Sequence, residues 1–231
     1  ISIPSNIKTI SSYAFSCCNK LTKVEIPINS NLQTIELKSF YCSNIKEIII
    51  SSKVTKICKE AFSFCHNLTK IEIPKNSNLQ IIESCAFIGS KIEEIYFPSS
   101  LLELKRHWYL GAHNLKRIII SPLNNHFIMK DEKCLLSKSD QNKNEFDILL
   151  FAFRNIEEIS IPSTIRIISY EAFYECKNLP KVEIPRNSDL QIIDTSAFSC
   201  SGIKEIFIPS KVKKICQEAF SNCKNLTKVE I

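Results

Sequence analysis

Residues 42–73 read CSNIKEIIISSKVTKICKEAFSFCHNLTKIEI, and residues 200–231 read CSGIKEIFIPSKVKKICQEAFSNCKNLTKVEI. Two stretches this long do not agree so closely by chance. Both stretches contain an apolar-x-apolar-Pro (or Ser) signature, which recurs along the whole chain. Its Pro-equivalent residues stand at positions 4, 27, 51, 74, 98, 121, 162, 185 and 209. Recurrence at such a spacing indicates stacked repeats.

The repeats come in two lengths that alternate. Successive signatures are 23 or 24 residues apart, so the true period is 47 residues, and one interval of 41 holds 17 extra residues. A Phe follows the Pro position by eleven residues in the shorter repeat and by thirteen in the longer one. We therefore expect one solenoid over residues 1–231, with nine repeats and a final strand. A β-hairpin-like insert is expected at about 123–150.

Each repeat begins with a short strand. Val24 and Ile26 alternate with Lys23 and Glu25, which is the pattern of a half-buried strand. Pro27 follows and ends the strand, because its ring removes a backbone donor. One repeat cannot bury its apolar face by itself, but stacked neighbours can. The sequence therefore predicts one parallel β-sheet along the solenoid.

The return segment of each repeat carries apolar residues about three apart, as at Val54, Ile57 and Ala61. This spacing suits a turn of α-helix or 3₁₀-helix. The predicted fold class is therefore an α/β solenoid, a right-handed superhelix with one parallel sheet and short helical or 3₁₀ return segments.

The combined pattern L-x-x-[IV]-x-I-P followed by [IV]-x-x-I-x-x-x-A-F-x-x-C resembles the BspA-like leucine-rich repeat family over essentially the whole chain. The resemblance implies a leucine-rich-repeat solenoid in a cell-surface or secreted protein, of surface-antigen type, used for adhesion and partner binding. It brings no catalytic residues with it. Three departures from the pattern predict altered packing: Trp108-Tyr109 replaces Ala-Phe, while Ala112 and Phe153 replace Cys.

Composition argues against several other functions. The net charge is +6, but Lys and Glu alternate along most of the chain, so no basic patch for nucleic acid is expected. Only three glycines are present, which disfavours glycine-rich phosphate loops. No apolar run reaches the roughly 18–20 residues of a membrane span. We therefore expect no nucleic-acid binding and no direct membrane insertion.

Eleven cysteines are present, and most fall at one position in each repeat. Gly89 and Ala112 share that position, which indicates a requirement for a small buried side chain. A disulfide framework stays open as an alternative, because neighbouring strands lie within disulfide range. Close Cys pairs of the zinc-binding kind are absent from the sequence. The four histidines, His66, His107, His113 and His126, belong to no recognisable catalytic motif.

The candidate site is the outward face of the predicted sheet. Two residue columns should face solvent there, one of alternating charge and one that mixes Glu with apolar residues. Their members are Lys23, Glu25, Glu47, Ile49, Lys70, Glu72, Glu94, Tyr96, Arg117, Ile119, Glu158, Lys181, Glu183, Glu205 and Phe207. Tyr96, Ile119 and Arg117 should form a patch of residue types enriched at protein interfaces.

The sequence therefore predicts a protein without catalytic residues, cofactor or metal, which acts by binding. The partner is expected to be a protein, host extracellular-matrix and surface proteins included, or a glycan. The expected location is the cell surface or the medium. The alternative is an intracellular scaffold for protein–protein interaction, because the same solenoid would serve there and free thiols suit a reducing compartment.

Overall fold

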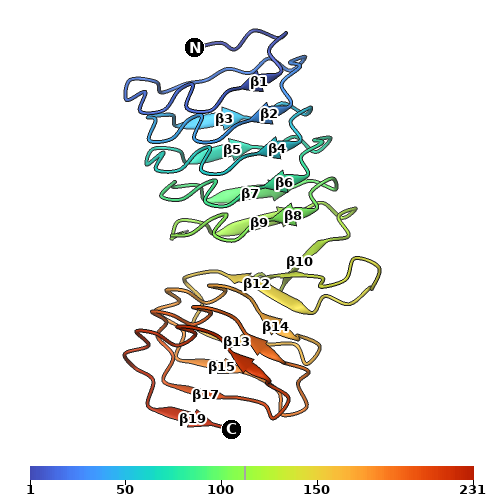
Figure 1. Cartoon of the computed structure of the whole chain (residues 1–231), viewed down its shortest axis with the longest axis vertical. Helices are drawn as coiled ribbons and strands as arrows, with labels where there is room; N and C mark the ends of the chain where they lie inside the picture. Colours follow the sequence, from blue (N-terminus) through green and yellow to red (C-terminus); the bar gives the residue numbers. More distant parts are fainter. Residues whose placement is uncertain (112) are drawn as a thin grey trace. The chain divides into compact units, whose positions relative to one another are not determined.

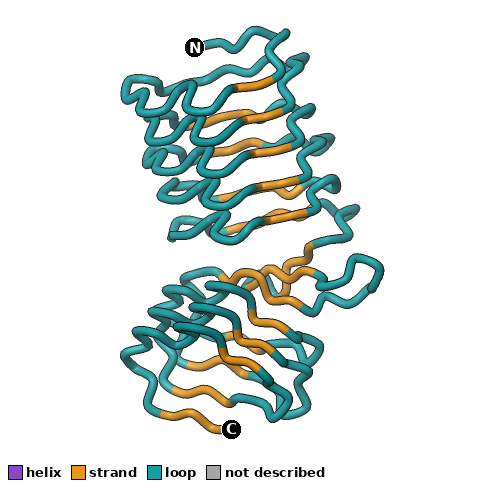
Figure 2. Tube along the Cα trace, viewed as in Figure 1, coloured by secondary structure: helices purple, strands orange, loops and turns teal. Residues whose placement is uncertain are grey.

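The computed structural model describes residues 1–111 and 113–231, and it is built from short strands joined by turns (Figure 1). Among these residues no helix is present, and Figure 2 shows only strands, loops and turns. The chain divides into two compact units, Ile1–Asn125 and His126–Ile231. Ala112, one of the predicted departures, lies outside the described residues.

Each unit has two sets of strands. The first two repeats form only isolated bridges, Ser2 with Glu25 and Lys23 with Glu47, so the strand predicted around Val24 is not formed as such. The primary strands of the other repeats lie where the sequence predicted them. They are β3 (Glu47–Ile49), β5 (Lys70–Glu72), β7 (Glu94–Phe97) and β9 (Arg117–Ile120) in the N-terminal unit, and β13 (Ile159–Ser160), β15 (Lys181–Glu183), β17 (Glu205–Phe207) and β19 (Lys228–Glu230) in the C-terminal unit. They pair in parallel, as β3–β5, β7–β9 and β13–β15–β17–β19.

The second set was not predicted, except for the strands of the hairpin-like insert. It comprises β1 (Thr9–Ile10), β2 (Thr34–Ile35), β4 (Lys56–Ile57), β6 (Ile81–Ile82) and β8 (Glu103–Leu104) in the N-terminal unit. In the C-terminal unit it comprises β10 (Phe127–Lys130), β11 (Cys134–Ser137), β12 (Ile148–Ala152), β14 (Ile167–Ile168), β16 (Ile192–Ile193) and β18 (Lys214–Ile215). The expectation of one parallel sheet was therefore wrong. Every repeat adds to a second sheet in its own unit, with a strand of two residues except where the insert supplies β10, β11 and β12.

The helical or 3₁₀ return segments, and with them the α/β description, were also wrong. The N–H groups of Ala61 and Ser63 bond carbonyls three residues back, at 3.1 Å. The N–H groups of Glu60, Phe62 and Phe64 instead bond carbonyls of the next repeat, at 2.6–3.1 Å. A helix would use every N–H within itself. In these turns, alternate N–H groups bond carbonyls of the neighbouring repeat instead. The repeats are therefore linked by strands and turns, and the fold is a β-solenoid.

Backbone dihedrals show how this sharing is achieved. Glu60 and Phe64 both have positive φ, near 58°, and the same two positions are left-handed in every described return turn. This conformation costs a non-glycine residue roughly 1–2 kcal/mol and interrupts a helix. The spacing of three residues fits two successive tight turns as well as it fits a helix, which is why periodicity did not distinguish them.

The core of each unit contains a ladder of phenylalanine rings. In the N-terminal unit Phe15, Phe40, Phe62 and Phe87 stack with centroids 5.2, 5.2 and 5.7 Å apart. In the C-terminal unit Phe173, Phe198 and Phe220 stack at 4.9 and 5.3 Å. These rings supply much of the buried apolar surface between neighbouring repeats.

Packing differs at Trp108-Tyr109, as the departure from the pattern predicted. Tyr109 is tilted by 53° to Phe87, with its centroid 6.3 Å away. Its hydroxyl donates to the Ile92 carbonyl at 2.7 Å, and burial raises its pKa to about 12. Trp108 is also buried and meets Phe97 edge-on at 5.6 Å.

The thiols in the small-residue column make specific contacts. Cys65 is buried, and its Sγ lies 3.0 Å from the Phe40 carbonyl and 3.4 Å from Ser43 Oγ. Cys223 repeats this arrangement with Phe198 and Ser201 at the same distances. All eleven cysteines are free thiols. The thiol is therefore a hydrogen-bond donor as well as a small apolar group.

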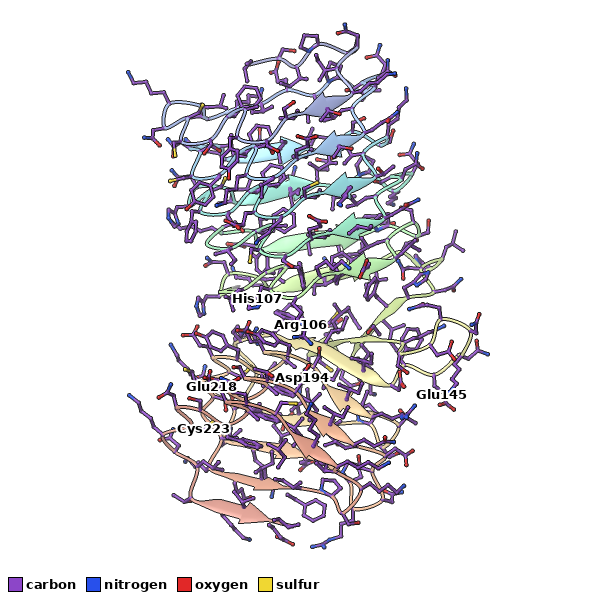
Figure 3. All side chains as sticks on the ribbon, viewed as in Figure 1. Arg106, His107, Glu145, Asp194, Glu218 and Cys223 are labelled. Atoms are coloured by element: carbon purple, nitrogen blue, oxygen red, sulfur yellow. The ribbon has the colours of Figure 1, made fainter. Side chains whose placement is uncertain are left out.

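The inserted residues join the second sheet of the C-terminal unit. β10 and β11 form a hairpin closed by the Lys133 N–H to the Lys130 carbonyl at 3.0 Å, and β11 pairs antiparallel with β12. The loop between β11 and β12, which carries Glu145, projects from the unit (Figure 3). Buried Asp147 holds the loop, because it accepts hydrogen bonds from the backbone N–H and the hydroxyl of Ser139.

Candidate protein-binding surface

The candidate surface, called the strand face below, is the outward side of the primary strands. Along β3, Glu47 and Ile49 are exposed while Ile48 between them is buried, and β5 repeats this alternation. This follows from the two-residue period of a strand whose other side packs on the core. The strand face therefore consists of every second residue of each primary strand.

All fifteen predicted site residues have solvent access. Tyr96, Ile119, Glu205 and Phe207 are partly exposed, and the exposed ones are Lys23, Glu25, Glu47, Ile49, Lys70, Glu72, Glu94, Arg117, Glu158, Lys181 and Glu183. The strand register aligns many of them directly. Glu47 is opposite Lys70 and Ile49 opposite Glu72. Tyr96 is opposite Ile119, so these two side chains of the predicted patch are neighbours.

The alternating charges pair less regularly than the column pattern suggests. Two pairs cross between strands: Arg117 meets Glu94 at 3.2 Å, and Lys181 meets Glu205 at 2.7 Å. Lys181 donates to Glu205, which lowers the pKa of that carboxyl and raises the pKa of the lysine. Such solvent-exposed pairs contribute little to stability.

Other lysines pair with a glutamate two residues further along the chain. Lys23 pairs with Glu25 at 3.0 Å, and Lys70 pairs with Glu72 at 3.4 Å. Glu158 pairs with Lys133 of the insert at 2.9 Å, a contact that the column pattern does not reveal. These pairs are also solvent-exposed, so a partner can displace them at small cost.

The C-terminal unit has a shallow groove in its strand face, with a volume of about 400 Å³. The predicted residues Lys181, Glu183, Glu205 and Phe207 line it. Arg186 also lines it and was missed. Its guanidinium carbon lies 5.0 Å from the centroid of the Phe207 ring, a cation–π arrangement.

Arg186 is held at a second point by Glu230, 2.8 Å away. Ring and carboxylate together fix the orientation of the guanidinium and leave further N–H donors for a partner. The sequence signal was available but weak: Arg186 follows a strand-ending Pro, as Lys75 does in an earlier repeat. Aromatic and Arg side chains of this kind are enriched at protein interfaces.

Over residues 1–111 and 113–231, no group of three or more His, Cys, Asp or Glu is placed to hold a metal ion. Burial raises the pKa of Cys65 to about 11 and that of Cys134 to about 12, so both thiols are protonated at neutral pH. Within the described part of the chain, no helix has the length and apolar character needed to cross a membrane.

Comparison with protein families gives one match, to a model described as the BspA type leucine rich repeat region. It matches residues 1–126 and 144–231, in six copies. No curated protein matches the chain. The sequence resemblance is thereby confirmed.

Three solved structures share the fold. The pneumococcal vaccine antigen PcpA is 22% identical with a TM-score of 0.85, covering 99% of this chain and 61% of that one. A leucine rich cell surface protein from Faecalibacterium prausnitzii A2-165 is 22% identical, with a TM-score of 0.66 and coverages of 99% and 78%. A leucine-rich repeat protein from Eubacterium ventriosum ATCC 27560 is 18% identical, with a TM-score of 0.62 and coverages of 100% and 78%. This chain thus spans about three fifths of the PcpA chain.

Proposed function

This chain belongs to the BspA-type leucine-rich-repeat family, and from that membership we propose that it is a non-enzymatic protein-binding module of a cell-surface or secreted protein. Its strand face makes the contact. The observation that carries the proposal is the in-register exposure of apolar and charged side chains on the primary strands, Tyr96 opposite Ile119 above all. Solenoids commonly use such extended surfaces for binding. We further propose that both units belong to one repeat array.

The names of two similar structures support the surface location. One is a vaccine antigen and the other a cell surface protein, and both share the fold at about a fifth of residues identical. An adhesive role follows as part of the same proposal, with a protein as the partner and a glycan as the second candidate. An intracellular scaffold is the competing function, which the free thiols favour.

Site-specific photocross-linking in the native cell tests the binding surface. A photoreactive amino acid at Tyr96 should yield a covalent adduct with another protein. The matched control places the same group at Thr9, an exposed residue of the second sheet in the same unit. Adducts of equal yield at both positions, or adducts from Thr9 alone, would assign binding to a different face.

Antibody labelling of intact and permeabilised cells tests the location. Staining of intact cells is expected. Staining that requires permeabilisation would reject the surface proposal and favour the scaffold. Because the cross-linking readout does not depend on compartment, the two parts of the proposal can fail separately.

A further inference from the structure

One column of the strand face in the N-terminal unit alternates acidic and apolar residues. Its members are Glu25, Ile49, Glu72, Tyr96 and Ile119. The bridge between Lys23 and Glu47 aligns the first two rows, the β3–β5 pairing sets Ile49 opposite Glu72, and the β7–β9 pairing sets Tyr96 opposite Ile119. β5 and β7 are in contact as neighbouring strands of the stack, although they belong to separate two-stranded sheets. Ile49 is 52% exposed, and Tyr96 and Ile119 are partly exposed.

The spacing of this column is set by the sheet. Neighbouring strands lie about 4.8 Å apart, so Ile49 and Tyr96, two strands apart, are separated by about 9.6 Å. Glu72 lies about midway between them. A partner that contacts all three must therefore present apolar side chains at roughly 9.6 Å, with a basic side chain halfway, all on one side.

An α-helix lying across the strands meets these requirements. Residues i, i+3 or i+4, and i+7 share one side of a helix, and seven residues rise about 10.5 Å. An extended strand repeats on one side every 6.6–6.8 Å or so, which misses both distances. A polyproline II segment repeats about every 9.3 Å, but its intermediate residues point elsewhere and leave Glu72 without a contact.

The charges on the strand face indicate the charge that a partner should carry. The predicted site residues of this unit comprise four carboxylates, Glu25, Glu47, Glu72 and Glu94, and three cations, although the chain as a whole is +6. Glu47 forms no ion pair within the described residues, and Glu25 and Glu72 each pair with an exposed lysine two residues away in the chain. These seven residues carry a net charge of −1 on a protein of net charge +6, and their carboxylates are open to a basic partner.

We propose that the strand face of the N-terminal unit binds an amphipathic, basic α-helix of a partner protein, laid across β3, β5, β7 and β9. Counting along that helix, basic residues at the first and eighth positions meet Glu25 and Glu72. Apolar residues at the fourth, eleventh and fifteenth positions meet Ile49, Tyr96 and Ile119. This inference rests on the proposed function, since it assumes that the strand face is the binding surface.

The C-terminal unit carries the same alternation independently. Its column reads Ser160, Glu183, Phe207 and Glu230, so an apolar ring again stands between two carboxylates. Here Arg186 covers the Phe207 ring and pairs with Glu230. The N-terminal unit has Lys75 at the equivalent sequence position, and its Ile49 is 52% exposed whereas Phe207 is only partly exposed.

Designed peptides test the proposal on the full chain by fluorescence anisotropy. The probe is a labelled helical peptide with lysines at the first and eighth positions and leucines at the fourth, eleventh and fifteenth. One control has the same composition and helicity, with these five residues distributed around the helix. A second control is a proline-rich peptide carrying the same side chains. We expect the probe to bind at least about tenfold more tightly than either control.

A charge exchange gives the sharper readout. Glu72→Lys should weaken the probe about fivefold, and replacing the eighth lysine of the peptide by glutamate should restore binding to that variant. Glu72→Gln should have a smaller effect, and Trp108 fluorescence checks that both variants are folded. Equal binding of probe and permuted peptide, tighter binding of the proline-rich peptide, or no rescue would overturn the helix proposal. Adducts at Tyr96 in cells would still support the binding surface, so the two failures are distinguishable.

Discussion

Replacing Phe62 by Leu tests the idea that ring stacking joins the repeats. Phe62 is fully buried and stacks on both Phe40 and Phe87, with interplanar angles of 3° and 11°. Each such pair contributes roughly 0.5–1.5 kcal/mol beyond burial. Loss of two pairs, together with the small cavity left by the shorter side chain, should lower the free energy of unfolding by about 3 kcal/mol.

Phe15→Leu is the matched control. Phe15 has a single stacking partner in the ladder, Phe40, and is only partly buried. Loss of one pair at this site should cost about 1 kcal/mol. The two variants lie in the same unit and differ in burial and in the number of stacked neighbours, so their difference measures what an inner position of the ladder adds over its end.

Urea unfolding followed by tryptophan fluorescence provides the assay. The chain has one Trp, Trp108, which is buried in the N-terminal unit and reports on that unit alone. With a slope of about 2 kcal/mol per M, the midpoint should fall by about 1.5 M for Phe62→Leu and about 0.5 M for Phe15→Leu. Equal shifts in the two variants would refute the reasoning, because they would show no dependence on the number of stacked rings.

Three further outcomes are expected. Gly202→Ala should destabilise the C-terminal unit far more than Gly111→Ala destabilises the N-terminal one. A Cβ at 202 would lie 2.0 Å from the Lys177 carbonyl oxygen, whereas position 111 faces open space and a substitution there adds only the strain of its positive φ, 74°. Thermal unfolding measures both losses, and similar losses would contradict this. Burial alone would raise the pKa of the Glu83 carboxyl, but the hydrogen bonds that it accepts outweigh burial and hold its pKa below the usual 4.5. The stability that this carboxylate contributes is therefore present above about pH 4.5 and is lost as the pH falls below it. In urea unfolding, Glu83→Gln should reduce the fall in the free energy of unfolding between about pH 5 and pH 3. If that fall is the same as in the unmodified protein, Glu83 does not contribute to the pH dependence. Iodoacetamide at neutral pH should label exposed Cys17 well before buried Cys65 in peptide mass spectrometry, and equal rates would contradict the buried hydrogen-bonded thiol.

The primary strands could be predicted because one of their sides is buried. Ile48 between Glu47 and Ile49 shows why: a two-residue period fixes which side chain faces the core. The same alternation located the strand face, and all fifteen predicted residues have solvent access there.

Apart from the strands of the insert, the second sheet and the return turns could not be predicted by the same means. A strand of two residues, such as β4, is too short to show a period. The left-handed positions of the turns are occupied by residues as different as Tyr13, Glu60 and Phe64, where glycine would be the usual signal. Their conformation depends on hydrogen bonds to the next repeat, which no local pattern contains.

Contacts made by residues off the primary strands were also beyond the sequence pattern. The orientation of the Arg186 side chain depends on Phe207 and Glu230, which contact it from the next two repeats. Lys133 reaches Glu158 only because the insert folds into the second sheet. In both cases the signal lies in the stacking of distant segments.

The alternation of long and short repeats also constrains how a gene for such a protein can change in length. Loss of the single repeat that carries Glu47 would set Lys23 directly against Lys70, and like charges opposite one another in a sheet are unfavourable. Gain or loss of a matched pair restores every neighbour relation. Recombination should therefore favour gain or loss of repeats in pairs, with lengths that change in steps of 47 residues.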